Sequence, residues 1–200
     1  MSRPHFFHLL LYMVTVWSSD KIHVEADFDH FVLAVQWPVT YCATVKCVIL
    51  PPEDWIIHGF WPSKKNGDPV NDCRDILFNI TRIPPNIKDR MNEIWPDLLH
   101  NNGNSEFWSN QWWKHGRCAD VPGTQTIDEY FTKTIHLADQ YIALISKILS
   151  KEKIFKGFSY GSLWLFEIHV CFERNFVVMN CPEKKIYKGR VYYPTNMNMG

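Results

Sequence analysis

Two histidines and one lysine occur in sequence settings that suit acid–base chemistry. His58 lies in the short apolar stretch IIHGFWP, residues 56–62, and Lys114 and His115 are adjacent in FWSNQWWKHGRC, residues 107–118. An imidazole has an ordinary pKa of about 6.5, so one ring can accept a proton while another donates one. A nearby ammonium group stabilises negative charge in a transition state. Two imidazoles and a lysine that face one cleft would therefore suit phosphoryl transfer.

His58 taken alone has three interpretations: a packed core residue, a metal ligand or a proton carrier. A lone histidine in an apolar strand is more often a core residue, but the second segment makes a proton carrier the favoured interpretation. A metal site is not expected, because the chain has no His-Glu-x-x-His motif and no Cys-x-x-Cys pair. We therefore predict no metal and no cofactor.

The N-terminal segment has the pattern of a cleavable secretion signal over residues 1–19. It has a basic residue at Arg3, an apolar centre at residues 9–17 and a small residue at Ser19. The apolar part is too short to cross a bilayer, which takes about 20 residues, and a buried N-terminal helix is the alternative. Cleavage would leave residues 20–200 as a single domain with no membrane anchor.

The cysteines and one sequon are consistent with an exported protein. An even number of cysteines behind a secretion signal indicates disulfides in an oxidising compartment, although six cysteines allow about 15 pairings. Proximity in the sequence favours two local bridges and leaves one long-range pair: Cys42–Cys47, Cys171–Cys181 and Cys73–Cys118. The sequon Asn79-Ile80-Thr81 predicts glycosylation of Asn79 in a secreted protein.

The balanced charge argues against a broad electrostatic interaction with nucleic acid. The chain has 21 basic and 21 acidic residues, so any contact with RNA would have to be local and to use aromatic stacking. Aromatic residues make up 15% of the chain, which fits either stacking or a large aromatic core. For Trp108 and Trp112 we expect the core.

The elements that would position these residues alternate between strand and helix patterns. Strands are predicted within residues 30–38 and 54–62, each ending in Trp-Pro, and are expected to be neighbours in one sheet. Amphipathic helices are predicted at three places: residues 86–99, from about residue 106, and residues 128–151. Strand patterns return at residues 162–182, where a hairpin closed by a disulfide is expected. The predicted fold class is α+β.

The long-range bridge would bring the two histidines together. If the segment from residue 106 is helical, Gln111, Lys114 and His115 share one face and Cys118 lies one turn further along. A Cys73–Cys118 bond would then hold this end of the helix close to the strand that carries His58.

The two segments resemble the active-site segments of the ribonuclease T2 family. IHGFWP is similar to His-Gly-Leu-Trp-Pro in typical members, and FWSNQWWKHGRC is similar to Phe-Trp-x-His-Glu-Trp-x-Lys-His-Gly-Thr-Cys. The resemblance implies an α+β fold with a central antiparallel sheet, packed helices and disulfide staples. It also implies a secreted, lysosomal or vacuolar acid endoribonuclease. Such an enzyme would cleave single-stranded RNA without metal, through a 2′,3′-cyclic phosphate.

Residue by residue, the resemblance implies specific roles. His58 matches the general acid, His115 the general base and Lys114 the lysine that stabilises the phosphorane. Trp61 matches a base-stacking tryptophan, and Phe107 lies where the family has an aromatic residue in its other base site. The family's disulfides also support the Cys73–Cys118 and Cys171–Cys181 pairs.

The chain departs from the family pattern inside the second segment. Asn110 and Gln111 stand where typical members have His-Glu, so an imidazole and a carboxylate become neutral amides that cannot exchange protons. Ser63 replaces an aspartate that helps to read the base in many members. Arg117 replaces a threonine and adds a charge that either contacts phosphate or, as we favour, is a solvated residue at a helix end.

Two functions are compatible with this sequence. The favoured one is a secreted monomeric endoribonuclease with reduced or altered activity. The three residues that the reaction most requires, His58, Lys114 and His115, are all present. Its partner would be single-stranded RNA, with no DNA and no membrane after signal cleavage. The alternative is a catalytically impaired, secreted RNA- or protein-binding factor on the same scaffold.

Overall fold

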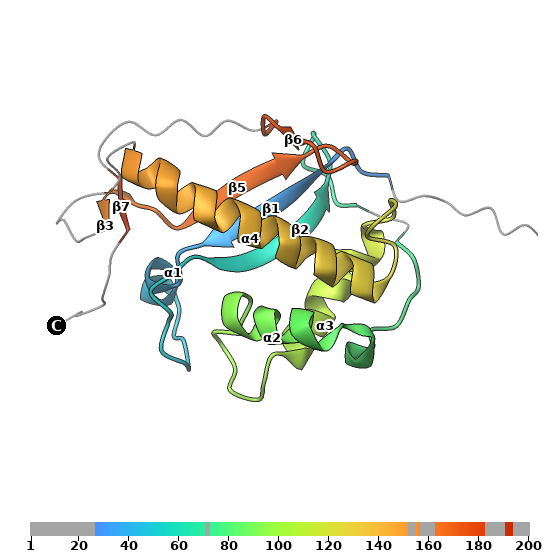
Figure 1. Ribbon diagram of the computed structural model, residues 1–200, viewed down its shortest axis with the longest axis horizontal. Helices are drawn as coiled ribbons and strands as arrows, with labels where there is room; N and C mark the ends of the chain where they lie inside the picture. Colours follow the sequence, from blue (N-terminus) through green and yellow to red (C-terminus); the bar gives the residue numbers. More distant parts are fainter. Residues whose placement is uncertain (1–26, 71–72, 152–154, 157–162, 183–190, 194–200) are drawn as a thin grey trace, which may run out of the picture.

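A four-stranded antiparallel sheet forms the centre of the computed structural model (Figure 1), which describes residues 27–70, 73–151, 155–156, 163–182 and 191–193. The strands are β1 (His30–Gln36), β2 (Ile56–Ser63), β5 (Glu167–Phe172) and β6 (Val178–Met179), in the order β2-β1-β5-β6. The two strands predicted to be neighbours do pair, as β1 and β2. The predicted secretion signal lies outside the described residues.

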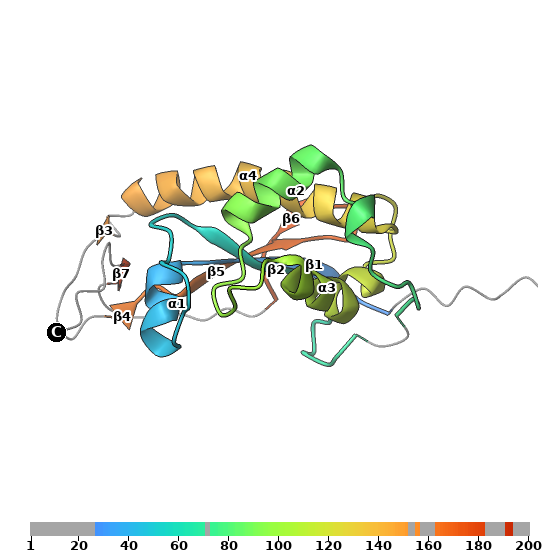
Figure 2. The same cartoon turned by 90° about the horizontal axis from the view of Figure 1, so that it is seen from below.

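One face of this sheet forms the main core against the long helix α4 (Ile127–Lys151). Phe31 of β1 stacks on Phe60 of β2 with ring centroids 4.7 Å apart. The hydroxyl of Tyr130, in α4, donates to the carbonyl of Phe60 at 2.7 Å. Figure 2 shows α4 and α2 (Pro85–Ile94) on one side of the sheet. Alternation along β1 therefore directs the residues between these core positions toward the opposite face.

The opposite side of the sheet carries the remaining helices. In Figure 2, α1 (Pro38–Thr44) and α3 (Ser105–Lys114) lie on this side. Two short 3₁₀ helices, η1 (Ile80–Arg82) and η2 (Gly116–Cys118), lie in the connections. The expected core positions of Trp108 and Trp112 are confirmed, since each is at most 2% exposed. The fold class is α+β, as expected.

Proline residues account for three differences from the predicted element ends. Pro38 begins α1 instead of only ending a strand, because its fixed φ suits the first helical position. Pro62 does not end β2, which is an edge strand and continues to Ser63. The helix predicted to reach residue 99 ends at Ile94, since the residue before Pro96 disfavours helical geometry.

Disulfides fasten the segments around the sheet. The structure contains the three pairs favoured by the sequence: Cys42–Cys47, Cys73–Cys118 and Cys171–Cys181. A second small sheet with the order β3-β7-β4 was not predicted, and its strands are β3 (Phe155–Lys156), β7 (Val191–Tyr193) and β4 (Leu163–Trp164). Among the described residues, no helix has the length and apolar character to span a bilayer.

Candidate active site

The sheet face that points away from α4 gathers polar side chains from β2 and β5. In the centre of this face, Ala34 of β1 pairs with Gly59 on one side and His169 on the other. Directly opposed residues of antiparallel strands share a face. The small residues at positions 34 and 59 leave room on this face for larger side chains from β2 and β5.

His58 occupies an irregular position in β2. The register shifts between Ala34 and Val35, whose partners are Gly59 and Ile57, so His58 is the extra residue of a bulge. A bulge redirects a side chain, and here the imidazole is 42% exposed and reaches β5. Its Nδ1 lies 2.5 Å from Oε2 of Glu167.

Glu167 contacts two imidazoles at once. Its Oε2 lies beside His58, and its Oε1 lies 2.5 Å from Nε2 of His169. Burial would raise the pKa of Glu167, but hydrogen bonds from His169 and His58 outweigh it and hold the pKa at about 2. The ionised carboxylate can only accept, so both rings donate to it. This arrangement leaves Nε2 of His58 as the nitrogen that can exchange a proton with a substrate.

His115 lies at the end of α3, in a different environment from His58. The helix ends at Lys114, and His115 is the C-cap with φ −131° and ψ −55°. The expectation that Gln111, Lys114 and His115 share one helical face is therefore wrong at His115, whose backbone is no longer helical. Only its N–H continues the helical pattern, donating to the carbonyl of Gln111 at 3.0 Å.

Burial and positive neighbours keep the imidazole of His115 neutral in the resting state. Desolvation, then the charge of Lys114, then that of His58 lower the pKa of His115 to about 4. The ring is therefore neutral over most of the pH range in which the protein would work. A neutral imidazole close to an ammonium group can act as a base that is ready to accept a proton.

The ring of Trp61 lies close to three histidine rings. Its ring centroid is 5.1 Å from that of His58, 5.6 Å from His115 and 5.9 Å from His169. A Cβ atom at Gly59 would overlap the indole nitrogen of Trp61 and come within 2.9 Å of Oε1 of the buried Gln111. Position 59 therefore accepts only glycine while Trp61 keeps this orientation.

Two cavities open on the two sides of this cluster. The larger, of about 430 Å³, is lined by Trp61, Lys114, His115 and His169, together with residues of the loop that follows β2. The smaller, of about 150 Å³, is lined by residues that include His58, Phe107 and Asn110. Trp61 and Phe107, the two predicted base-contacting residues, thus lie in separate cavities.

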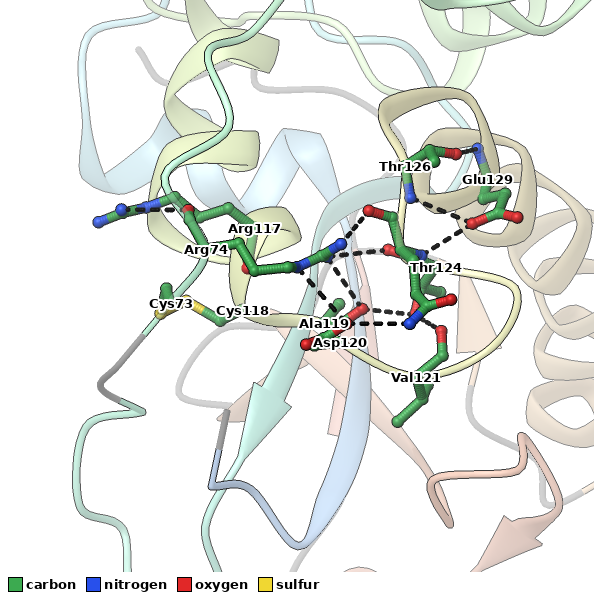
Figure 3. A network of polar contacts seen from close by, with 11 residues as sticks. Cys73, Arg74, Arg117, Cys118, Ala119, Asp120, Val121, Thr124, Thr126 and Glu129 are labelled. Carbon is green, nitrogen blue, oxygen red and sulfur yellow. Dashed lines mark hydrogen bonds and ion pairs between the residues drawn. A yellow bond between two sulfur atoms is a disulfide. The ribbon is translucent and has the colours of Figure 1, made fainter. Parts of the chain in front are cut away.

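The loop after η2 is fixed by Arg74, a residue that sequence reasoning did not identify. Figure 3 shows its guanidinium directed into this loop, beside the Cys73–Cys118 bond. The acceptors are four backbone carbonyls, those of Arg117, Ala119, Thr124 and Gln125. Nε of Arg74 also lies 3.6 Å from Oδ1 of the buried Asp120. The only sequence signal was an arginine next to a bridging cysteine.

Arg117 lies partly exposed at a helix end, as favoured by the sequence, and also contacts Trp113. Its Nε donates to the carbonyl of Trp113 at 2.7 Å, and its guanidinium carbon lies 3.7 Å from the centre of the Trp113 ring. Arg117 is not among the residues that line either cavity. Its guanidinium therefore packs on the ring of the exposed Trp113.

Three further residues noted in the sequence, Asn110, Ser63 and Asn79, lie at or near the surface. Asn110 is exposed at the smaller cavity, while Ser63 lines the larger one and donates to the carbonyl of Trp61 at 3.3 Å. Asn79 is exposed, and its Oδ1 accepts from the backbone and hydroxyl of Thr81. Within the described part of the chain, no group of three or more His, Cys, Asp or Glu residues is arranged to hold a metal ion.

Sequence reasoning missed Glu167 and His169. Their separation of two residues on a strand places both side chains on one face, and this was the available signal. The strand itself was predicted, but the sequence does not reveal that β5 pairs with the far edge of β1 and so lies within reach of His58.

The geometry defines an α+β protein in which the rings of His58 and His115 lie on either side of one tryptophan, with His58 at one cavity and Lys114 and His115 at another. A family model described as the Ribonuclease T2 family matches residues 28–185. The chain belongs to this family. Membership of this family supports the identification of the protein as an endoribonuclease.

Individual relatives match most of the chain. Ribonuclease DdI of Dictyostelium discoideum is 27% identical and the match covers 91% of this chain and 90% of the relative. Ribonuclease T2 of Sus scrofa is 28% identical, with 84% and 98% covered. Among solved structures, RNase NT in complex with 5′-AMP has a TM-score of 0.68 at 23% identity, and human RNase T2 has 0.64 at 22%. Each structural match covers 84% of this chain and at least 98% of the other, and shows a shared fold.

Proposed function

We propose that this protein cleaves single-stranded RNA by transphosphorylation. His115 takes the proton from a ribose 2′-hydroxyl, and the 2′-oxygen attacks the adjacent phosphorus. The bond from phosphorus to the 5′-oxygen breaks, and that oxygen receives a proton from His58. Lys114 stabilises the negative charge of the phosphorane. The products are a 2′,3′-cyclic phosphate and a 5′-hydroxyl, and the step needs no water and no electron transfer.

The observation that carries this proposal is the opposite charge beside each imidazole. His58 donates from Nδ1 to the ionised carboxylate of Glu167, which orients the ring and leaves Nε2 for proton transfer. His115 lies beside the ammonium of Lys114 and is held neutral, with a pKa of about 4. An imidazole that is hydrogen-bonded to a carboxylate and a neutral imidazole beside an ammonium group would form the acid–base pair that this reaction requires.

Two aromatic side chains would bind the bases on either side of the scissile phosphate. Trp61 borders the larger cavity and Phe107 borders the smaller one. Stacking on an aromatic ring is worth about 1–3 kcal/mol per base and tolerates different sequences. The substrate would therefore be single-stranded, with its bases splayed apart.

We also infer that the protein is exported as a monomer and works in an oxidising compartment, either outside the cell or in a lysosomal or vacuolar lumen. Three disulfides support this, since such bonds persist in oxidising compartments. The exposed Asn79 would carry the glycan. Residues 1–19 would be the secretion signal, leaving residues 20–200 as one domain.

The first experiment is an RNA cleavage assay from about pH 4 to pH 8, a range that brackets the ordinary pKa of histidine. We expect cleavage that persists in EDTA, leaves 2′,3′-cyclic ends and disappears in His58→Ala and in His115→Ala. A folded wild-type protein that cleaves no more than these variants would reject the proposal and favour the binding-factor alternative.

We further propose that the amides at positions 110 and 111 limit turnover, since neither can exchange a proton. The double variant Asn110→His with Gln111→Glu should therefore raise kcat, by about 10-fold or more if one acid–base group is regained. Steady-state kinetics on the same RNA tests this. An unchanged kcat in a folded double variant would show that these positions are not the limitation.

A further inference from the structure

We propose that His169, held in place by Glu167, is a phosphate-binding residue of this site and supplies the imidazole that position 110 no longer offers. The inference rests on the proposed function, because the ligand it assigns is the phosphate group on which His58 acts. Glu167 is a positioning residue for both rings.

The first support is the geometry of β5. Glu167 and His169 lie two residues apart on one face of the strand, and the Cα partner of His169 on β1 is Ala34. Because Ala34 is small and its other partner is Gly59, nothing bulky from β1 separates His169 from Trp61. The ring of His169 is accordingly 5.9 Å from that of Trp61 and nearly perpendicular to it, at 86°.

The second support is the position of the donor atoms. Nε2 of His169 donates to Oε1 of Glu167 at 2.5 Å. In an imidazolium the remaining donor is Nδ1–H, which can bind a phosphate oxygen. The side chain is 48% exposed and lines the larger cavity together with Lys114 and His115. A phosphate entering this cavity would meet the ammonium group of Lys114 and the imidazole ring of His169.

The third support is the position of Asn110. It lines the smaller cavity, with His58 and Phe107, and does not line the larger cavity with Lys114. Its neutral amide also contributes no positive charge. Glu167 connects the two cavities, because one of its oxygens binds His58 and the other binds His169. The shared carboxylate therefore holds the two rings beside one another, one at each cavity.

The test measures phosphate binding and RNA cleavage separately. Binding of inorganic phosphate is followed by phosphorus NMR titration, and kcat and KM are measured on single-stranded RNA. His169→Gln should weaken phosphate binding and raise KM about 10-fold, the loss expected for one hydrogen bond to a charged group, while kcat stays within about twofold. Glu167→Gln should weaken phosphate binding as well and also lower kcat, because it releases His58.

Matched variants separate phosphate binding from a structural role. His136→Gln removes an exposed imidazole on α4 and should change neither measurement. His169→Lys restores a cationic donor and should recover most of the phosphate affinity. Phosphate binding by His169→Gln equal to that of His136→Gln would overturn the inference. If the wild-type protein binds phosphate through His169 but cleaves no RNA, the proposed function fails and the phosphate site stands.

Discussion

At the scale of single residues, the different roles proposed for two identical side chains rest on their opposite environments. His58 and His115 have the same chemistry in solution, yet one donates to a carboxylate and the other lies beside an ammonium group. Neither environment is a property of the histidine itself. The proposed assignment of acid and base therefore depends on Glu167 and Lys114, and changing either neighbour should change the pH dependence of RNA cleavage.

Lys114→Met should move the acidic limb of the pH–rate profile to higher pH. In the wild type, kcat/KM should fall as pH drops toward about 4, where His115 becomes protonated. Lys114 contributes to this low pKa, so removing its charge lets His115 protonate at higher pH. We also expect kcat to fall by about 10²-fold or more through lost charge stabilisation.

Lys114→Arg is the matched control, because it keeps the positive charge and should leave the acidic limb close to its wild-type position. A limb that stays in place in Lys114→Met would contradict the electrostatic explanation.

Gly59→Ala should displace Trp61 and lower both stability and activity. The added methyl group would overlap the indole nitrogen, and overpacking of this kind costs about 1–3 kcal/mol. Urea unfolding and RNA cleavage measure the two effects. In a Trp61→Ala background the same substitution should cost much less stability, since the atoms that clash are gone. Equal costs in both backgrounds would show that the indole is not the obstacle.

At the scale of elements, the active site depends on how α3 ends. Lys114 is the last helical residue, and His115 turns away from the helix before η2. The Cys73–Cys118 bond and the Arg74 contacts hold the chain immediately after this turn (Figure 3). The backbone conformation of His115 is thus supported by a network that contains no catalytic residue.

Arg74→Met should destabilise the protein by about 3 kcal/mol or more, because it leaves the buried carboxylate of Asp120 without this charge partner. Arg90→Met removes an exposed ion pair with Asp139 on α4 and should cost less than about 1 kcal/mol. Urea unfolding of both variants makes the comparison. Similar losses in the two would show that the Arg74 network is no stronger than a surface pair.

At the scale of the whole molecule, the site makes the folded state sensitive to acid. The pKa of His115 is about 4 in the folded protein and 6.5 in the reference state. Its contribution to stability is therefore complete above pH 6.5 and lost as pH falls toward 4. The pKa of Glu167 is lowered from 4.5 to about 2, so its contribution is complete above pH 4.5 and lost as pH falls toward 2.

The free energy of unfolding should accordingly decline between pH 6.5 and 4, by up to about 1.4 kcal/mol per pH unit from His115. His115→Gln should remove this slope while leaving the decline below pH 4.5 in place. Urea unfolding at a series of pH values provides the measurement, with His136→Gln as the control. A slope retained in His115→Gln would assign the acid sensitivity to other groups.

Several features of the fold follow from local sequence patterns. The strand that carries His58 and the helix that carries Lys114 were predictable, because alternating and helical apolar patterns reflect which side of an element is buried. The small sheet of β3, β7 and β4 was not, since strands of two or three residues carry too little pattern. The helix α1 was missed because Pro38 can either end a strand or begin a helix.

The sequence by itself determined which side chains can carry protons, which cysteines are near one another, and where Gly59 and Trp61 stand relative to His58. Only the tertiary structure decided that Glu167 holds His58 and His169 together and that Arg74 fixes the chain after His115. These contacts join residues 109 and 43 positions apart in the chain. Local patterns reflect burial within one element, whereas contacts of this kind depend on strand order, register and the bulge at His58. Those features are settled by packing of the whole chain.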